Sequence, residues 1–193
     1  MSKSLIVHPL HSPQEHLMRT IILLLTILVP TIMLVRPSTA IQFPDGRTAF
    51  DSPPRLIKAE SNDPKPNMPS TYYFTLDIPA NAGEPLKAVK IVQRENLETI
   101  DYKDNATRVF QGNRQERGTQ VPLVSIGGPT KPGMITVVFD SPVEPGETVT
   151  VALKAKRNPT YGGIYQFGVT AYPAGEKSIG QFLGYTRVEF DTD

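Results

Sequence analysis

The sequence contains no cysteine and no tryptophan, and its three histidines all precede residue 17. Residues 41–193 therefore have neither an imidazole nor a thiol. This absence excludes a Ser-His-Asp or Cys-His nucleophilic site from that region. It also removes the side chains that most often bind zinc, copper or haem iron, so we expect no metal site and no cofactor.

A charge excess of either sign is also lacking. Three of the 20 basic residues and one of the 19 acidic residues precede residue 41, which leaves residues 41–193 with a net charge of about −1. Nucleic-acid binding usually needs a basic patch or stripe, and membrane-surface binding a lysine-rich amphipathic helix. The sequence shows neither, so we expect no nucleic-acid partner.

One long hydrophobic run is present, from Ile21 to Val35, between Arg19 and the segment Pro37-Ser38-Thr39-Ala40. A basic start, an apolar run and small residues at positions 38 and 40 are typical of a cleaved export signal. The run would span roughly 22 Å as a helix, less than the roughly 30 Å bilayer core.

We therefore predict a signal peptide over residues 18–40, cleaved between Ala40 and Ile41. An uncleaved signal that anchors the protein is the alternative, and it would be the only membrane attachment. Residues 1–17 are mixed and acidic at Glu15, unlike the leader of a signal. We hypothesise that Met18 is the initiator and that residues 1–17 are an upstream extension from a misplaced gene start.

Residues 41–70 contain six prolines and little periodicity, which predicts an irregular N-terminal arm with one short strand around residues 56–59. From residue 71 onward apolar and polar residues alternate with period two, the pattern of strands with one buried face. The clearest segments are residues 71–78, 134–140, 148–155, 164–171 and 184–190. Weaker strand patterns cover residues 88–93, 97–102, 108–111 and 121–126, with a short helix near residues 84–87 or 94–98.

The alternation also assigns faces. In residues 148–155 it places Val149, Val151 and Leu153 in the core and Thr150 on the solvent side, and in residues 164–171 it places Tyr165 in the core. Pro-Gly pairs at 132–133 and 145–146 favour type II turns. We predict an all-β fold: an antiparallel, immunoglobulin-like β-sandwich of about eight strands over residues 71–193, forming one unit with the arm. A small closed β-barrel is the alternative.

The run from Phe139 to Phe190 (FDSPVEPGETVTVALKAKRNPTYGGIYQFGVTAYPAGEKSIGQFLGYTRVEF) resembles the signature of a family of exported cyanobacterial proteins of unknown function. Residues 54–56, 72–78 and 78–91 are similar to the N-terminal half of that family. The resemblance implies a signal-bearing, single-domain protein in the periplasm or the thylakoid lumen. It implies no activity and no catalytic residue.

Three segments are candidates for a functional site. Glu95, Glu98, Asp101 and Asp104 recur at three-residue spacing. They are candidates for an acid–base pair or for oxygen ligands of calcium, or they simply form a solvated edge. Residues 157–163 contain a basic residue, an Asn-Pro pair, Tyr161 and a Gly-Gly pair. They could form a binding loop, or a loop whose tight backbone geometry requires these residues. Residues 181–185 place apolar side chains between two glycines, either for binding or as core packing.

From these segments we predict four binding residues: Arg157, Asn158, Tyr161 and Tyr185. The function that fits best is a non-catalytic, exported accessory or binding domain, with an unknown protein or envelope component as its partner. Carbohydrate binding through Tyr161 and Tyr185 is one alternative, and a carboxylate-dependent hydrolase is another. No residue is predicted to be catalytic.

Overall fold

A computed structural model describes residues 41–42, 45–127 and 132–192, all within the unit Ser38–Asp193. The upstream segment (residues 1–17) and the predicted signal peptide (residues 18–40), with Ala40 of the cleavage site, lie outside the described residues. Within the described ranges, no helix has the length and hydropathy needed to cross a membrane.

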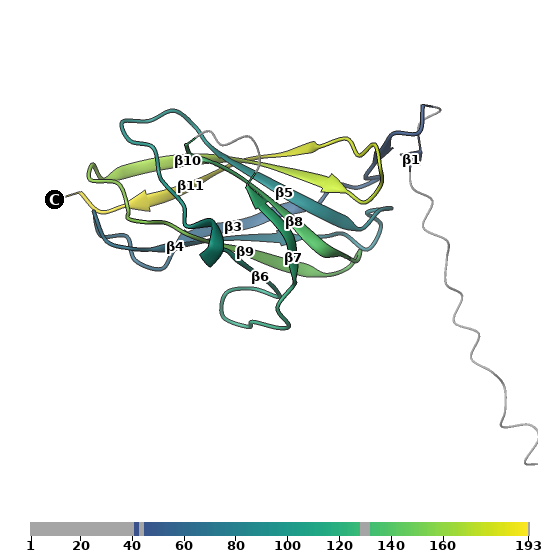
Figure 1. The fold of residues 1–193 in the computed structure, drawn as a ribbon, viewed down its shortest axis with the longest axis horizontal. Coiled ribbons are helices and arrows are strands. Elements are labelled where there is room, and N and C mark those ends of the chain that lie inside the picture. Colours follow the sequence, from purple (N-terminus) through teal and green to yellow (C-terminus); the bar gives the residue numbers. More distant parts are fainter. Residues whose placement is uncertain (1–40, 43–44, 128–131, 193) are drawn as a thin grey trace, which may run out of the picture. The chain divides into compact units, whose positions relative to one another are not determined.

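Two antiparallel sheets pack face to face in a β-sandwich (Figure 1). One sheet has five strands in the spatial order β11–β10–β5–β8–β7: β5 (Leu86–Gln93), β7 (Leu123–Gly127), β8 (Met134–Val143), β10 (Gly163–Pro173) and β11 (Gln181–Phe190). The other has four strands in the order β3–β4–β9–β6: β3 (Arg55–Ser61), β4 (Thr71–Asp77), β6 (Arg108–Gln111) and β9 (Thr148–Lys154). The all-β, immunoglobulin-like prediction is confirmed, and in the described part of the chain the two sheets do not close into a barrel.

Short elements sit at the margins of the sandwich. β1 (Ile41–Gln42) pairs with β2 (Thr48–Ala49), and η1 (Asp104–Ala106) is a single 3₁₀ turn. The predicted strand over residues 97–102 is a loop with one isolated bridge, between Tyr102 and Ala155. The predicted short helix is absent from both of its suggested positions, which are a bend leading into β5 and a loop after it.

The predicted core faces are confirmed where the two sheets meet. Tyr72, Phe74 and Leu76 of β4 are fully buried, as is the alternating set on β9. Aromatic rings join the sheets: the Phe74 and Phe167 centroids lie 5.5 Å apart, and the Tyr72 and Phe190 centroids also lie 5.5 Å apart. This inter-sheet packing is what positions the outer faces of both sheets.

The outer face of the four-stranded sheet departs from the prediction. Thr150 was expected to face solvent, but it is fully buried. Its hydroxyl donates to the carbonyl of Gly112 at 2.7 Å and lies 2.9 Å from the Thr75 hydroxyl. The reason is the loop after β6, residues 112–120, which covers this face; we call it the cover loop.

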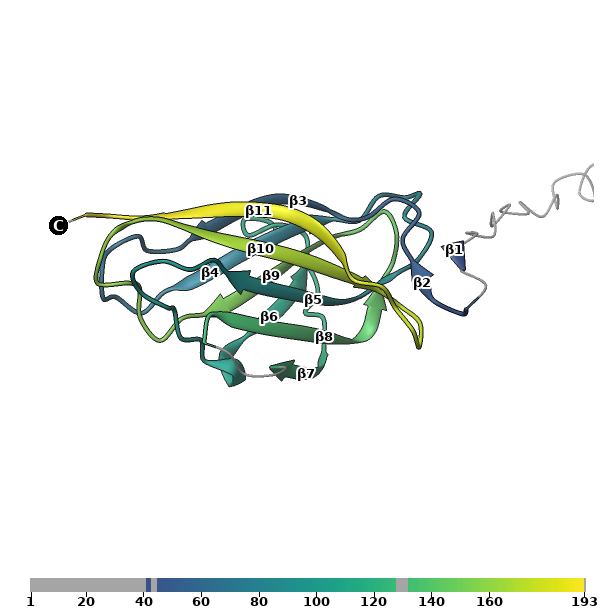
Figure 2. The same ribbon diagram turned by 90° about the horizontal axis from the view of Figure 1, so that it is seen from above.

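The two turns with Pro-Gly pairs behave as predicted where they are described. Gly146 has φ of 91°, and the amide of Glu147 donates to the Glu144 carbonyl at 3.3 Å, as in a type II turn. Seen from above, β3 and β11 run side by side as the neighbouring edge strands of the two sheets (Figure 2). β2 lies beside the turn that joins β10 to β11, because the amide of Ile179 donates to the Thr48 carbonyl.

Candidate functional site

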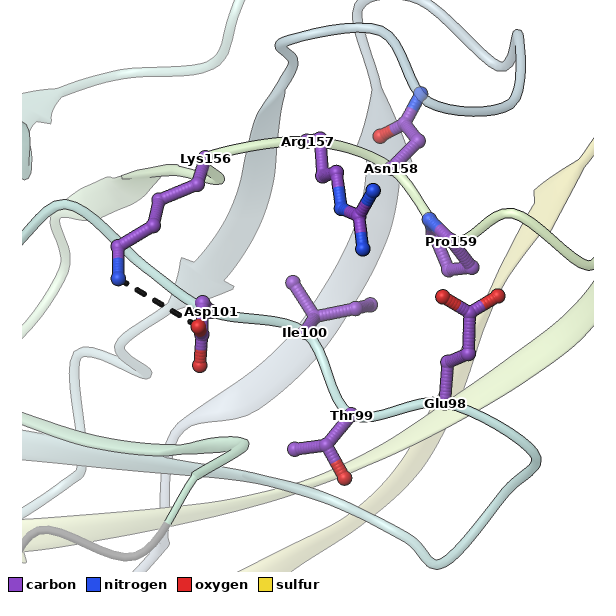
Figure 3. Close-up of a pocket in the computed structure, with 8 residues that line it drawn as sticks. All are labelled: Glu98, Thr99, Ile100, Asp101, Lys156, Arg157, Asn158 and Pro159. Atoms are coloured by element: carbon purple, nitrogen blue, oxygen red, sulfur yellow. Dashed lines mark hydrogen bonds and ion pairs between the residues drawn. The ribbon is translucent and has the colours of Figure 1, made fainter.

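Two of the three candidate segments meet at one end of the sandwich. The loop after β5 and the loop between β9 and β10 enclose a pocket of about 300 Å³. Its lining residues are Glu98, Thr99, Ile100, Asp101, Lys156, Arg157, Asn158 and Pro159 (Figure 3). The sequence contained both segments but no signal that they would face each other.

The pocket has acidic side chains on either side of an apolar floor. Figure 3 shows Glu98 and Asp101 flanking Ile100, with the Glu98 carboxylate directed toward Pro159. Glu98 accepts a hydrogen bond from the amide of Tyr161 at 2.7 Å, and Asp101 lies 3.5 Å from the Lys156 ammonium. The two carboxylates do not point toward one another, whereas an acid–base pair must converge on one bond.

Arg157 and Asn158 are neighbours with different roles. The Arg157 side chain is exposed and reaches into the pocket (Figure 3), where its Nη1 lies 3.5 Å from the Asn67 side-chain oxygen. Asn158 is fully buried. Its amide donates to the carbonyls of Asp63 and Lys65 at 2.7 Å, and its oxygen accepts from the Tyr72 hydroxyl at 2.8 Å. Asn158 therefore holds the loop in place, and its side chain is already engaged within the protein.

Tyr161 stands at the rim of the same end with 61% of its surface exposed. Its backbone carbonyl accepts a hydrogen bond from the Tyr165 hydroxyl at 3.0 Å. Burial, with a smaller effect of nearby Glu98, raises the pKa of that hydroxyl, so it stays a neutral donor. Gly162 is required next to Tyr161, because a Cβ there would collide with the carbonyl of Asp191.

Tyr185 lies away from the pocket, on the outer face of the five-stranded sheet. It is 59% exposed, and Phe182 beside it is 54% exposed, with the ring centroids 5.0 Å apart. The Arg94 guanidinium lies over the Tyr185 ring at 5.1 Å and donates to the side chain of Gln166 at 2.9 Å. The predicted site residues thus fall into two places, with Tyr185 separated from the other three.

A third aromatic residue continues this arrangement toward the turn between β10 and β11. Tyr172 faces outward, since Ala171 before it is fully buried, and its ring lies against Gly180, where a Cβ would be 2.5 Å from the ring. We call Tyr185, Phe182 and Tyr172 the aromatic ladder.

A bulge in β11 is the reason that sequence reasoning did not place Phe182 beside Tyr185. Gly184 pairs with Val169 and Phe182 with Thr170, so Leu183 is an extra residue. Without the bulge, Phe182 and Tyr185 would point to opposite faces, because they are three residues apart. The glycine at position 184 is the one sign of the bulge that the sequence carries, and in the structure it has a φ of 118°.

The chain matches a known family over most of its length. Residues 47–190 match DUF2808, which is described as a protein of unknown function. The chain belongs to this family. The family carries no described activity, so the match confirms a single domain of unknown function and assigns no role to any residue of the site. No curated protein matches the chain.

Several solved structures share the sandwich architecture at low identity. The collagen-binding subdomain ACE19 of the Enterococcus faecalis surface protein ACE is 6% identical, with 74% of this chain and 99% of that chain covered and a TM-score of 0.46. The C-terminal domain of the Streptococcus pyogenes antigen I/II-family protein AspA is 14% identical, with 78% and 45% covered and a TM-score of 0.41. A cohesin module from Clostridium perfringens is 15% identical, with 74% and 95% covered and a TM-score of 0.36.

Proposed function

We propose that this protein is an exported, non-catalytic binding domain that acts in the periplasm or the thylakoid lumen. The observation that carries the proposal is the open outer face of the five-stranded sheet, where Phe182 and Tyr185 each expose more than half of their surface. Clustered exposed aromatic side chains on a rigid element are typical of interaction sites. Their strands are held by the core, so the binding surface is formed before a partner arrives.

The location outside the cytoplasm rests on the hydrophobic run and the small residues before Ile41. We propose cleavage after Ala40, which leaves residues 41–193 as one unit in which the arm precedes the sandwich. An uncleaved signal would leave the same unit attached to a membrane.

We propose the end pocket as a second, smaller contact region. Arg157 in the pocket and Tyr161 at its rim are exposed side chains that a partner could contact, and Asn158 acts as the anchor of their loop. A carboxylate-dependent hydrolase is supported less well, because Glu98 is already bonded to the Tyr161 amide and Asp101 lies beside Lys156. Pocket and ladder together favour binding over catalysis.

Affinity capture tests the proposal. The whole chain, expressed with its own N-terminal segment, is used to capture material from native envelope and thylakoid fractions. Phe182→Ala/Tyr185→Ala is the test variant, and Ile57→Ala is the control that removes a similarly exposed apolar side chain from β3 of the other sheet. We expect wild type and control to retain the same material and the double variant to lose it. Equal capture by all three proteins would overturn the assignment of the surface.

N-terminal sequencing of the exported protein tests its processing. We expect a mature chain that begins at Ile41. A chain that retains residues 18–40 would show that the signal serves as an anchor.

A further inference from the structure

We propose that the outer face of the five-stranded sheet binds an acidic, linear polysaccharide. Its sugar rings would stack along the aromatic ladder, and its acidic groups would meet three cationic side chains beside it. The inference rests on the proposed function of this face and names the class of its ligand.

The aromatic ladder follows the direction of two neighbouring strands, with Tyr185 and Phe182 on β11 and Tyr172 on β10. Tyr185 pairs with Gly168 and Phe182 with Thr170, while Tyr172 lies two residues further along β10. Two residues of a strand span roughly 7 Å, so Tyr172 follows the position of Phe182 at about that distance along the sheet. The Phe182 and Tyr185 rings lie closer together, with their centroids 5.0 Å apart over Gly168. A linear chain of sugar rings suits such a row, because each sugar has a face of C–H groups that packs against an aromatic ring.

Glycines seat these rings on the sheet. A Cβ at Gly168 would lie 3.1 Å from ring atoms of both Phe182 and Tyr185, and Gly180 admits the Tyr172 ring in the same way. Aromatic side chains over glycines also repair the weak packing of a glycine within a strand. Covering Gly168 does not account for the whole of the Phe182 and Tyr185 rings, because over half of the surface of each residue remains exposed to solvent.

Three cations surround the ladder. Lys90 pairs with Thr170, the partner of Phe182, and faces outward because Val89 and Ile91 are fully buried. Arg94 contacts the Tyr185 ring, and Arg187 is exposed two residues along the same strand. The ion pairs found among the described residues involve none of these three side chains.

This concentration of positive charge is local. The net charge of residues 41–193 is about −1, yet the nearest outward acid on β11 is Glu189, two residues beyond Arg187. Charge complementarity therefore selects a carboxylated or sulfated glycan over a neutral one. Thr170 lies between Phe182 and Lys90, and Gln166 lies between Arg187 and Arg94, so each offers a polar partner to sugar hydroxyls.

Two polymers with the same sugar backbone, one acidic and one neutral, distinguish the contribution of ring stacking to binding from the contribution of charge. Binding of the whole chain is measured by affinity electrophoresis in gels that contain carboxymethyl cellulose or neutral hydroxyethyl cellulose. We expect retardation by the acidic polymer, weaker retardation by the neutral one, and a loss of the difference at high salt, because salt screens exposed charges.

Variants then assign the residues. We expect Phe182→Ala/Tyr185→Ala to weaken binding to carboxymethyl cellulose about tenfold or more, and Tyr172→Ala to weaken it less. Lys90→Gln/Arg94→Gln/Arg187→Gln is expected to remove the preference for the acidic polymer. Lys65→Gln/Lys103→Gln/Lys177→Gln, which loses the same charge at exposed sites elsewhere, is expected to keep it. Circular dichroism and urea unfolding of every variant verify that the sandwich is intact.

The contrary outcomes separate this inference from the proposed function. Equal retardation by both polymers, unchanged in the charge variant, overturns the acidic ligand. Absence of polysaccharide binding, combined with capture of a protein that depends on Phe182 and Tyr185, overturns the glycan and leaves the binding surface standing. Absence of both overturns the proposed surface as well.

Discussion

The two outer faces of the sandwich have the same alternating strand pattern but differ in how far their aromatic side chains are exposed to solvent. On the four-stranded sheet, Tyr73 is only 8% exposed, with the guanidiniums of Arg114 and Arg117 lying 4.8 Å and 5.4 Å from its ring centre. On the five-stranded sheet, Tyr185 has one guanidinium over its ring, that of Arg94, and remains 59% exposed. The cover loop accounts for the difference, because both arginines at Tyr73 come from it.

The comparison shows how one residue type takes two roles. An aromatic ring covered by the protein's own loop contributes buried area and cation–π contacts to stability. An aromatic ring left open contributes little to stability and is available to a partner. The four predictions below test this division, from the largest expected effect to the smallest.

Tyr73→Ala should have the largest effect on stability. The change removes the ring on which Arg114 and Arg117 stack and the hydroxyl that accepts a hydrogen bond from Arg117 at 3.0 Å. We expect the free energy of unfolding to fall by about 3 kcal/mol, as for other large aromatic truncations. Urea denaturation measures it, and Tyr185→Ala is the matched control. Equal losses in the two variants would erase the contrast between the faces.

The stability of the protein should decrease at alkaline pH because of two tyrosines buried between the sheets. Burial raises the pKa of the Tyr72 hydroxyl and of the Tyr102 hydroxyl above the ordinary value for tyrosine. Above about pH 10 the unfolded chain releases these protons while the folded protein retains them. Stability is therefore complete below pH 10 and falls as the pH rises further, by about 1.4 kcal/mol per pH unit for each tyrosine.

Denaturation in urea at several pH values from 8 to 11, with absorbance at the tyrosinate band as a second readout, checks this slope. Tyr102→Phe keeps the ring and removes one titrating group, so it should reduce the slope. A slope unchanged in Tyr102→Phe would contradict the assignment of that proton.

Thr150→Val should loosen the cover loop without disturbing the core. The variant keeps the shape of the side chain but removes the hydrogen bond to the Gly112 carbonyl and the contact with the Thr75 hydroxyl. A buried carbonyl left without its donor costs about 1–2 kcal/mol. Hydrogen exchange should increase in residues 112–120 more than in β10. Uniform exchange across both regions would indicate global rather than local loosening.

Phe182→Ala/Tyr185→Ala should have the smallest effect on stability. Both rings are mostly in solvent, so the free energy of unfolding should change by no more than about 0.5 kcal/mol per residue, as for other surface substitutions. Thermal unfolding measures the change alongside the binding assays. A large loss of stability would mean that the ladder is part of the protein's own packing.

Strand positions followed from the sequence because alternation is a local signal. β6 was predicted at its observed bounds, and the buried set Tyr72, Phe74 and Leu76 lies on the predicted face. Residues 97–102 were wrongly assigned to a strand. They alternate only weakly, and in the fold the segment is a loop that forms one wall of the pocket.

The candidate site was predictable in its parts and not in its arrangement. Glu98, Asp101 and Arg157 were each candidates, but their meeting at one end depends on which loops the strand order brings together. Tyr185 was a candidate for a sugar, whereas Phe182 lies on the same face only because of the bulge at Leu183. A one-residue bulge reverses the faces of all preceding side chains, and period-two reasoning has no means to detect it.

By itself, the sequence determined that residues 41–193 have no imidazole or thiol, that their strands alternate, and that a signal-like segment precedes them. These are properties of composition and of neighbours along the chain. The tertiary structure alone decided which outer face is closed and which is open. That choice depends on contacts between residues far apart in the chain, such as Arg117 with Tyr73 and Arg94 with Tyr185, because only the folded strand order brings them within reach.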